Sequence, residues 1–341
     1  MNEFFRKYTR SDIDALVIAR NGETKLGERI DVAGEESLDV FLDKTKASFV
    51  VVGIAEDIGV AANYGRAGAS DTWNIFLRSF LNIQANAITR AESLAVIGHF
   101  SFDQVKEEIE KKPASIDEKV TAYRNAVTKI DDVVAELIGL IVSHKKIPIV
   151  VGGGHNNSYP LIKGSSLALN CRKGINCINL DAHLDYRAAE GRHSGNGFRY
   201  AKENGFLNRY FAVGIHENYL SDRIIKEFRL RRDMDFATYE DIFVRRKKTW
   251  RKALKSAVKF AGQKATGIEL DLDSISDVPS SAPTPCGIST REALQYIEYI
   301  AVHCDVAYLH ICEGIARSEN MVGKLITYLV MQFVKVHRDG K

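Results

Sequence analysis

Short runs of Val, Ile and Leu recur along the chain, and most of them are apolar at nearly every position. A strand with one exposed face alternates between apolar and polar residues, whereas a strand buried on both faces reads as a continuous apolar run. We therefore predict buried strands at 48–55, 93–98, 147–154, 175–183, 209–216, 265–273 and 305–314, with a weaker one at 234–240.

Amphipathic stretches separate these strands, with apolar residues at helical spacing in 116–143, 291–301 and 322–336. Buried strands that alternate with helices indicate a mostly parallel sheet between two helix layers. The chain shows no repeat and no Pro/Gly/Ser-rich linker. We predict an α/β fold, a single three-layer αβα domain with about eight strands, spanning 46–341, on which 1–45 packs as an N-terminal extension.

Four of the predicted strands end in side chains that can bind metal or exchange protons. Ligands of open parallel sheets bind beyond the carboxyl ends of the strands, so these four segments should meet at one edge. The side chains are His155 in the first segment, Asp181, His183 and Asp185 in the second, Asp271 and Asp273 in the third, and Glu313 in the fourth.

This combination of residue types favours a pair of metal ions. A lone aspartate after a strand is usually a turn or cap residue, and a lone histidine is usually hydrogen-bonded. Several carboxylates held together in a partly desolvated cleft repel one another, and divalent cations remove that cost. An oxygen-rich set with two imidazoles and no thiolate suits Mn²⁺ or a related hard ion better than a structural zinc, and two such ions can activate a water.

Bulk properties exclude several other classes. A formal charge of +3 over 341 residues gives no reason to expect nucleic acid or a membrane as partner, and we read the basic run at 245–255 as a solvated helix surface. Five cysteines without a CxxC pair indicate reduced thiols. We find neither a signal-like apolar segment at the N-terminus nor a membrane-length apolar stretch, so we predict a cytoplasmic protein.

Four motifs in order carry a resemblance to a known family. They are GIAEDIGVAANYGRAGA at 53–69, VGGGH at 151–155, NLDAHLD at 179–185 and ELDLDSI at 269–275. From residue 48 to its end the chain resembles the ureohydrolases, the family of arginase, agmatinase and formimidoylglutamase. The resemblance implies an arginase-like fold, two Mn²⁺ per subunit, a small amidine or guanidine as substrate, and a homotrimer or homohexamer.

The resemblance also implies roles for the residues at the strand ends. Asp185 would orient the attacking water in addition to binding metal. Glu313 would pair with the cationic amidine group, the alternative being a carboxylate that caps a helix. One ion would be held by His155, Asp181, Asp185 and Asp271, and the other by Asp181, His183, Asp271 and Asp273.

The loop after the second metal segment offers a further candidate, His193, in GRHSGNGFRY at 191–200. Arginases and agmatinases carry a loop histidine there that shuttles protons, although the spacing from NLDAHLD is shorter in this chain. The resemblance thus makes His193 a candidate proton shuttle, and the alternative is an exposed loop histidine.

Departures from the better-known family members favour one branch. The chain has GGGH in place of GGDH, Arg187 two residues after Asp185, and SGNGF, which resembles the SGTPF of formimidoylglutamases. Arg187 presents a guanidinium fork suited to a carboxylate, the alternative being a surface ion pair with Glu190. Arg199 is a candidate second carboxylate partner. N-formimidoyl-L-glutamate, which carries two carboxylates, would then be hydrolysed to L-glutamate and formamide in histidine breakdown.

Two rival functions stay open at this point. The first is a guanidine hydrolase of the agmatinase or arginase type, which releases urea. The second is a catalytically silent family member that acts as a binding subunit. The complete set of six metal-binding residues argues against the second, because a silent homologue is free to lose ligands.

Overall fold

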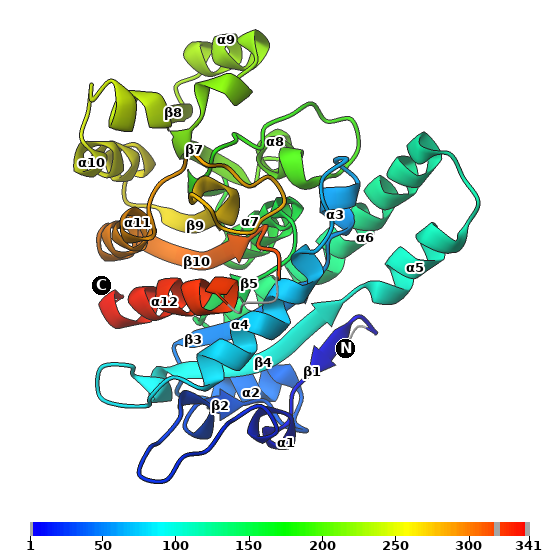
Figure 1. Cartoon of the computed structure of the whole chain (residues 1–341), viewed down its shortest axis with the longest axis vertical. Coiled ribbons are helices and arrows are strands. Elements are labelled where there is room, and N and C mark those ends of the chain that lie inside the picture. Colours follow the sequence, from blue (N-terminus) through cyan, green and yellow to red (C-terminus); the bar gives the residue numbers. More distant parts are fainter. Residues whose placement is uncertain (1–2, 317–320, 338–341) are drawn as a thin grey trace.

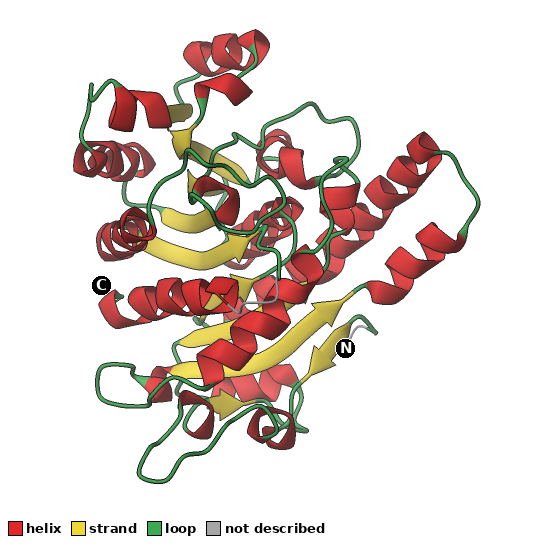
Figure 2. Ribbon diagram, viewed as in Figure 1, coloured by secondary structure: helices red, strands yellow, loops and turns green. Residues whose placement is uncertain are grey.

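The structure, a computed structural model, describes residues 3–316 and 321–337. A twisted sheet runs through the molecule and helices pack on both of its faces (Figures 1 and 2). Its ten strands are β1 (Phe5–Lys7), β2 (Asp31–Val32), β3 (Phe49–Ala55), β4 (Leu94–Ser101), β5 (Ile147–Val151), β6 (Ile175–Leu180), β7 (Leu207–Ile215), β8 (Met234–Thr238), β9 (Ala265–Asp271) and β10 (Asp305–Cys312).

The strands follow the order β1-β4-β3-β5-β10-β9-β6-β7-β8, with β2 paired beside β1 on β4. Only β1 runs antiparallel to its neighbour; the remaining pairs are parallel. All eight strands predicted from the apolar runs are present, and the predicted fold class is confirmed. Within the described residues the sheet has ten strands instead of about eight, because β1 and β2 add two short strands that the apolar pattern did not reveal.

Helices cover the sheet on each side, which gives three layers (Figure 2). The three predicted helical stretches correspond to α6 (Ile116–Ser143), α11 (Thr290–His303) and α12 (Met321–Val336). The helices are α1 (Arg10–Asp14), α2 (Leu38–Lys44), α3 (Ile58–Ala61), α4 (Thr72–Leu81), α5 (Asp103–Lys111), α6 (Ile116–Ser143), α7 (Ser158–Ala168), α8 (Gly197–Glu203), α9 (Asp222–Leu230), α10 (Trp250–Ala261), α11 (Thr290–His303) and α12 (Met321–Val336).

Two hydrophobic cores lie on opposite faces of the sheet, and successive residues of a strand contribute to them in turn. Phe49 and Val51 of β3 pack into the core beneath α4, α10, α11 and α12. Val50 and Val52 pack into the core beneath α2, α6, α7, α8 and α9. The period-two geometry of a strand thus explains why β3 is apolar at nearly every position.

The N-terminal segment contributes to the sheet edge. β1 pairs with β4 through Phe5, Arg6 and Lys7, and β2 pairs with β4 through Asp31 and Val32. The boundary near residue 45 stays a prediction. Among the described residues no helix is long and apolar enough to cross a membrane.

The sheet order explains how the predicted site can form. The strands β5, β10, β9 and β6 are four direct neighbours, although β5 and β10 are far apart in the sequence. All four run parallel, so their carboxyl ends meet at the same edge. The residues that follow these four strands are those singled out from the sequence.

Candidate metal centre

The turn after β5 places His155 at the carboxyl edge of the sheet. Gly153 has φ +74°, and a Cβ atom there would lie 3.0 Å from Glu56 Oε1 and 2.6 Å from the Asn157 side chain, so the turn requires glycine. Glu56 Oε1 accepts hydrogen bonds from Gly154 N at 3.0 Å and from Asn157 Nδ2 at 2.6 Å. The buried Glu56 carboxylate thereby fixes the backbone that leads into His155.

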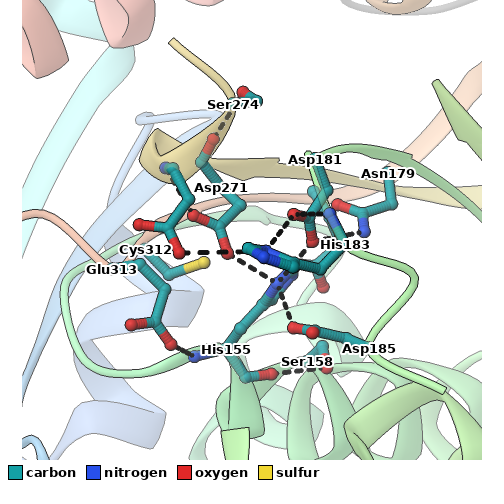
Figure 3. Close-up of polar contacts among 12 residues, drawn as sticks. His155, Ser158, Asn179, Asp181, His183, Asp185, Asp271, Ser274, Cys312 and Glu313 are labelled. Carbon is teal, nitrogen blue, oxygen red and sulfur yellow. Dashed lines mark hydrogen bonds and ion pairs between the residues drawn. The ribbon is translucent and has the colours of Figure 1, made fainter. Parts of the chain in front are cut away.

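The imidazole of His155 is fully buried and faces three carboxylates (Figure 3). Its Nδ1 lies 2.8 Å from Asp185 Oδ2, 3.2 Å from Asp181 Oδ2 and 3.2 Å from Asp271 Oδ2. One ring nitrogen cannot donate to three oxygens at once. A cation can contact several oxygens and one nitrogen together, and the ligand atoms of these four residues all lie within 4.8 Å of one another.

The second predicted ligand set lies beside the first and shares Asp181 and Asp271 with it. His183 Nδ1 is 3.5 Å from Asp181 Oδ1 and 4.0 Å from Asp273 Oδ2. Asp271 Oδ1 accepts a hydrogen bond from Asp273 N at 2.7 Å, which sets the two carboxylates of the third segment close together. The structure therefore brings all six predicted ligands to one place.

The pKa values of Asp271 and His183 indicate an excess of negative charge in the cluster. Burial, followed by the charges of Asp273 and Asp181, raises the pKa of Asp271 well above its usual value. Burial opposes protonation of His183, but the hydrogen bond to Asp181 and the charges of the neighbouring aspartates together outweigh it and raise the pKa of this imidazole to about 9. Carboxylates that resist ionisation beside imidazoles that retain protons are the expected response to excess negative charge, which divalent ions would neutralise.

A cavity of about 680 Å³ opens onto this cluster. Asp271, Asp273 and Glu313 line it and are buried, whereas His183 and Asp185 are partly exposed. Glu313 Oε1 accepts a hydrogen bond from His155 N at 2.6 Å, and its Oε2 has no hydrogen-bond partner within the described ranges. The Glu313 carboxylate thus caps a backbone N–H with one oxygen, as the alternative interpretation of this residue predicted.

His193 does not line the cavity. Its side chain is fully buried, Nδ1 accepts a hydrogen bond from Gly195 N at 3.1 Å, and Nε2 lies 3.5 Å from Glu190 Oε1. Burial, together with the charges of nearby arginines, lowers the pKa of His193 to about 3. His193 is therefore not an exposed loop histidine. Proton shuttling by His193 stays a prediction, and the geometry shows no direct route for it.

The two arginines nominated from the sequence have different surroundings. Arg187 lines the cavity and donates from Nη1 to Asn63 Oδ1 at 2.9 Å; Glu190, the predicted surface partner, pairs instead with Arg124. Arg199 lies outside the cavity lining.

The guanidinium of Arg199 has many partners in the protein. It donates to Glu227 Oε2 at 2.8 Å and to the carbonyl of Arg187 at 2.7 Å, and it lies over the ring of Tyr186. Arg199 therefore supports the loop that carries Arg187, and substrate binding by Arg199 stays a prediction that these contacts do not favour.

Sequence reasoning missed Glu269, a fully buried carboxylate behind the cluster. Its Oε2 lies 3.4 Å from His155 Nε2 and 2.6 Å from His310 Nδ1, and its Oε1 accepts a hydrogen bond from Tyr308 at 2.7 Å. A metal-binding histidine usually directs its other ring nitrogen to such a carboxylate, which fixes the tautomer. The available signal was a glutamate in the middle of a buried strand.

Replacing Glu269 with Gln should lower the affinity for Mn²⁺ by about 10- to 100-fold, because His155 loses the charged partner that orients it. Calorimetric titration with Mn²⁺ measures the effect. Tyr308→Phe is the matched control: it removes a neighbouring hydrogen bond to the same carboxylate and should have a much smaller effect. Equal Mn²⁺ affinity in wild type and Glu269→Gln would contradict this assignment.

Comparisons with known proteins show the family of this chain. Residues 47–314 match the model of the arginase family. A formimidoylglutamase of Macrococcus caseolyticus is 24% identical over 99% of this chain and 94% of its own length, and one of Streptococcus pyogenes is 24% identical over 85% of this chain and 86% of its own.

Solved structures show the same fold. The crystal structure of Trypanosoma cruzi formiminoglutamase with Mn²⁺ has a TM-score of 0.70 and 20% identity, covering 93% of this chain and 100% of that one. Formimidoylglutamase from Bacillus subtilis has a TM-score of 0.71 and 18% identity, covering 93% of both chains. With four motifs in order, a family match over most of its length and the predicted fold, this chain belongs to the arginase family and, with it, to the hydrolases of C–N bonds.

Proposed function

We propose that this protein hydrolyses N-formimidoyl-L-glutamate to L-glutamate and formamide and binds two Mn²⁺ ions per subunit. The observation that carries the proposal is the convergence of six ligand side chains beneath a cavity that also contains the free arginine donors of Arg187. Relatives named formimidoylglutamase over most of the chain support the choice of substrate. A substrate with carboxylates suits Arg187, whereas agmatine would bring a positive charge towards it.

In the proposed reaction the oxygen of a water molecule adds to the formimidoyl carbon. The bond between that carbon and the glutamate nitrogen then breaks, and the nitrogen takes up a proton, so that formamide and L-glutamate leave. Two bound Mn²⁺ ions would supply an activated water and stabilise the negative charge of the transition state. His155, Asp181, Asp185 and Asp271 would hold one ion, and Asp181, His183, Asp271 and Asp273 the other.

Three side chains of the cavity have further proposed roles. Asp185 accepts a hydrogen bond from the attacking water and thereby orients it. Glu313 pairs through its free Oε2 with the cationic amidine group. Arg187 binds a substrate carboxylate with the donors that Asn63 leaves free.

A product assay on the Mn²⁺-loaded protein tests the proposal. The substrates are N-formimidoyl-L-glutamate, arginine, agmatine and 4-guanidinobutyrate, and the products measured are formamide and urea. We expect formamide from the first and no urea from the others. Urea release without formamide would establish a guanidine hydrolase instead, and the absence of both products with Mn²⁺ bound would favour a binding subunit.

Arg187→Ala should raise KM for N-formimidoyl-L-glutamate by about 10- to 100-fold and change kcat little, because a charge-assisted hydrogen bond contributes about 1.5–3 kcal/mol. Steady-state kinetics measures both constants. Arg66→Ala is the matched control, since Arg66 is an exposed arginine near Asn63 that does not line the cavity. An unchanged KM in Arg187→Ala would refute carboxylate binding by this residue.

A further inference from the structure

The acidic and basic side chains that line the cavity lie at different depths. The buried part is lined by the carboxylates of Asp271, Asp273 and Glu313. Two arginines, Arg187 and Arg223, line the exposed part. A ligand with a cationic group at one end and carboxylates at the other matches this distribution.

Arg223 lies in the first turn of α9, a helix that begins after Ser221. The Ser221 hydroxyl accepts a hydrogen bond from Ile224 N and so caps the helix, and Ser221, Arg223 and Ile224 all line the cavity. Within residues 3–316 and 321–337, the Arg223 side chain has neither a hydrogen bond nor an ion pair.

Acidic residues close to Arg223 in the sequence, and the one acidic residue at the exposed end of the cavity, are already paired. Asp222 pairs with Lys226 at 3.0 Å, and Glu227 pairs with Arg199 at 2.8 Å. Glu190, which also lines the cavity, pairs with Arg124 at 3.3 Å. The guanidinium of Arg223 is thus available to a ligand in the cavity.

One arginine does not suffice for a substrate with two carboxylates. Arg187 donates a hydrogen bond from one Nη group to Asn63, which leaves one edge of its guanidinium for a single carboxylate. Arg199 cannot supply the second contact, because Glu227 and backbone carbonyls occupy it. Arg223 is the other arginine that lines the cavity, and its side chain is unpaired within the described ranges.

We propose that Arg223 binds the second carboxylate of the substrate and, with Arg187, selects amidines that carry two carboxylates over those that carry one. This inference rests on the proposed function and names the substrate class within it. It also explains how a cavity whose deep end is acidic can admit a molecule with two carboxylates, since each carboxylate stays at the exposed end beside an arginine.

Kinetics with two substrates tests the inference: N-formimidoyl-L-glutamate, and N-formimidoyl-4-aminobutyrate, which lacks the α-carboxylate. Arg223→Ala should raise KM roughly tenfold for the first, leave its kcat unchanged, and leave both constants for the second within about twofold. Arg223→Lys should restore part of the loss. Arg229→Ala, an exposed arginine of the same helix outside the cavity lining, should behave as wild type.

An unchanged KM for both substrates, or an equal rise for both, would overturn the inference. Failure of the proposed function is visible separately, because the wild-type protein would then release formamide from neither substrate. In that case calorimetric titration of the Mn²⁺-loaded protein with L-glutamate and with 4-aminobutyrate decides: weaker binding of L-glutamate alone in Arg223→Ala supports the dicarboxylate site, and identical binding by wild type and variant refutes it.

Discussion

Asp271→Asn should abolish hydrolysis and most of the Mn²⁺ binding. In the proposed site Asp271 is shared by both ions, so its loss removes a ligand from each. If this costs several kcal/mol of transition-state stabilisation, kcat/KM should fall by about a thousandfold or more. Steady-state kinetics and the Mn²⁺ content after gel filtration measure the two effects.

The same substitution should stabilise the metal-free protein. Burial and the neighbouring Asp273 and Asp181 raise the pKa of Asp271, so above the pKa of the unfolded chain this buried carboxyl group opposes folding, and a neutral Asn removes that cost. We expect a higher Tm than wild type in the presence of a chelator, which separates the loss of function from misfolding. Asp277→Asn, an exposed residue a few positions on, is the matched control and should change neither property. Normal Mn²⁺ content in Asp271→Asn would contradict the proposed site.

Asp131→Ala should lower the free energy of unfolding by about 3–5 kcal/mol, because it leaves a buried arginine without its partner. Asp131 in α6 accepts two hydrogen bonds from Arg192, from Nε at 2.7 Å and from Nη2 at 3.0 Å, and both side chains are buried. Burial raises the pKa of Asp131 to about 6 in spite of Arg192, which shows how costly desolvation is here. Urea denaturation followed by circular dichroism measures the loss.

Arg192 also connects the two loops that carry the site. Its Nη2 donates to Asn156 O at 2.8 Å, next to His155, and its Nη1 donates to Asn196 Oδ1 at 2.7 Å.

The matched control is Asp132→Ala, which removes an exposed carboxylate paired with Lys163 and should cost at most about 1 kcal/mol. Equal destabilisation by Asp131→Ala and Asp132→Ala would show that the buried pair with Arg192 contributes no more to stability than the exposed pair.

The strands and metal-binding residues could be predicted because their signals are local. A strand buried on both faces must be apolar at successive positions, and β6 indeed begins at Ile175 where the apolar run begins. Asp181 and His183 directly follow that apolar run, so the sequence alone already places them at the end of β6. The general rule that ligands gather at the carboxyl edge of a parallel sheet then brought the four segments together.

Features that depend on distant partners could not be predicted in this way. β1 and β2 have only three and two residues, and pairing with β4 defines them more than any pattern of their own. Arg199 had the right residue type, but Glu227, 28 positions away, engages it. Arg223 gave no signal in the sequence, because an arginine at the start of an amphipathic helix is ordinary until the cavity beside it is known.

The most direct test of the metal centre is anomalous diffraction at the manganese edge from crystals of the Mn²⁺-loaded protein. Two peaks about 3.5–4 Å apart are expected. One should contact His155 and the other His183, with Asp271 between them. A single peak, or peaks away from these side chains, would contradict the account.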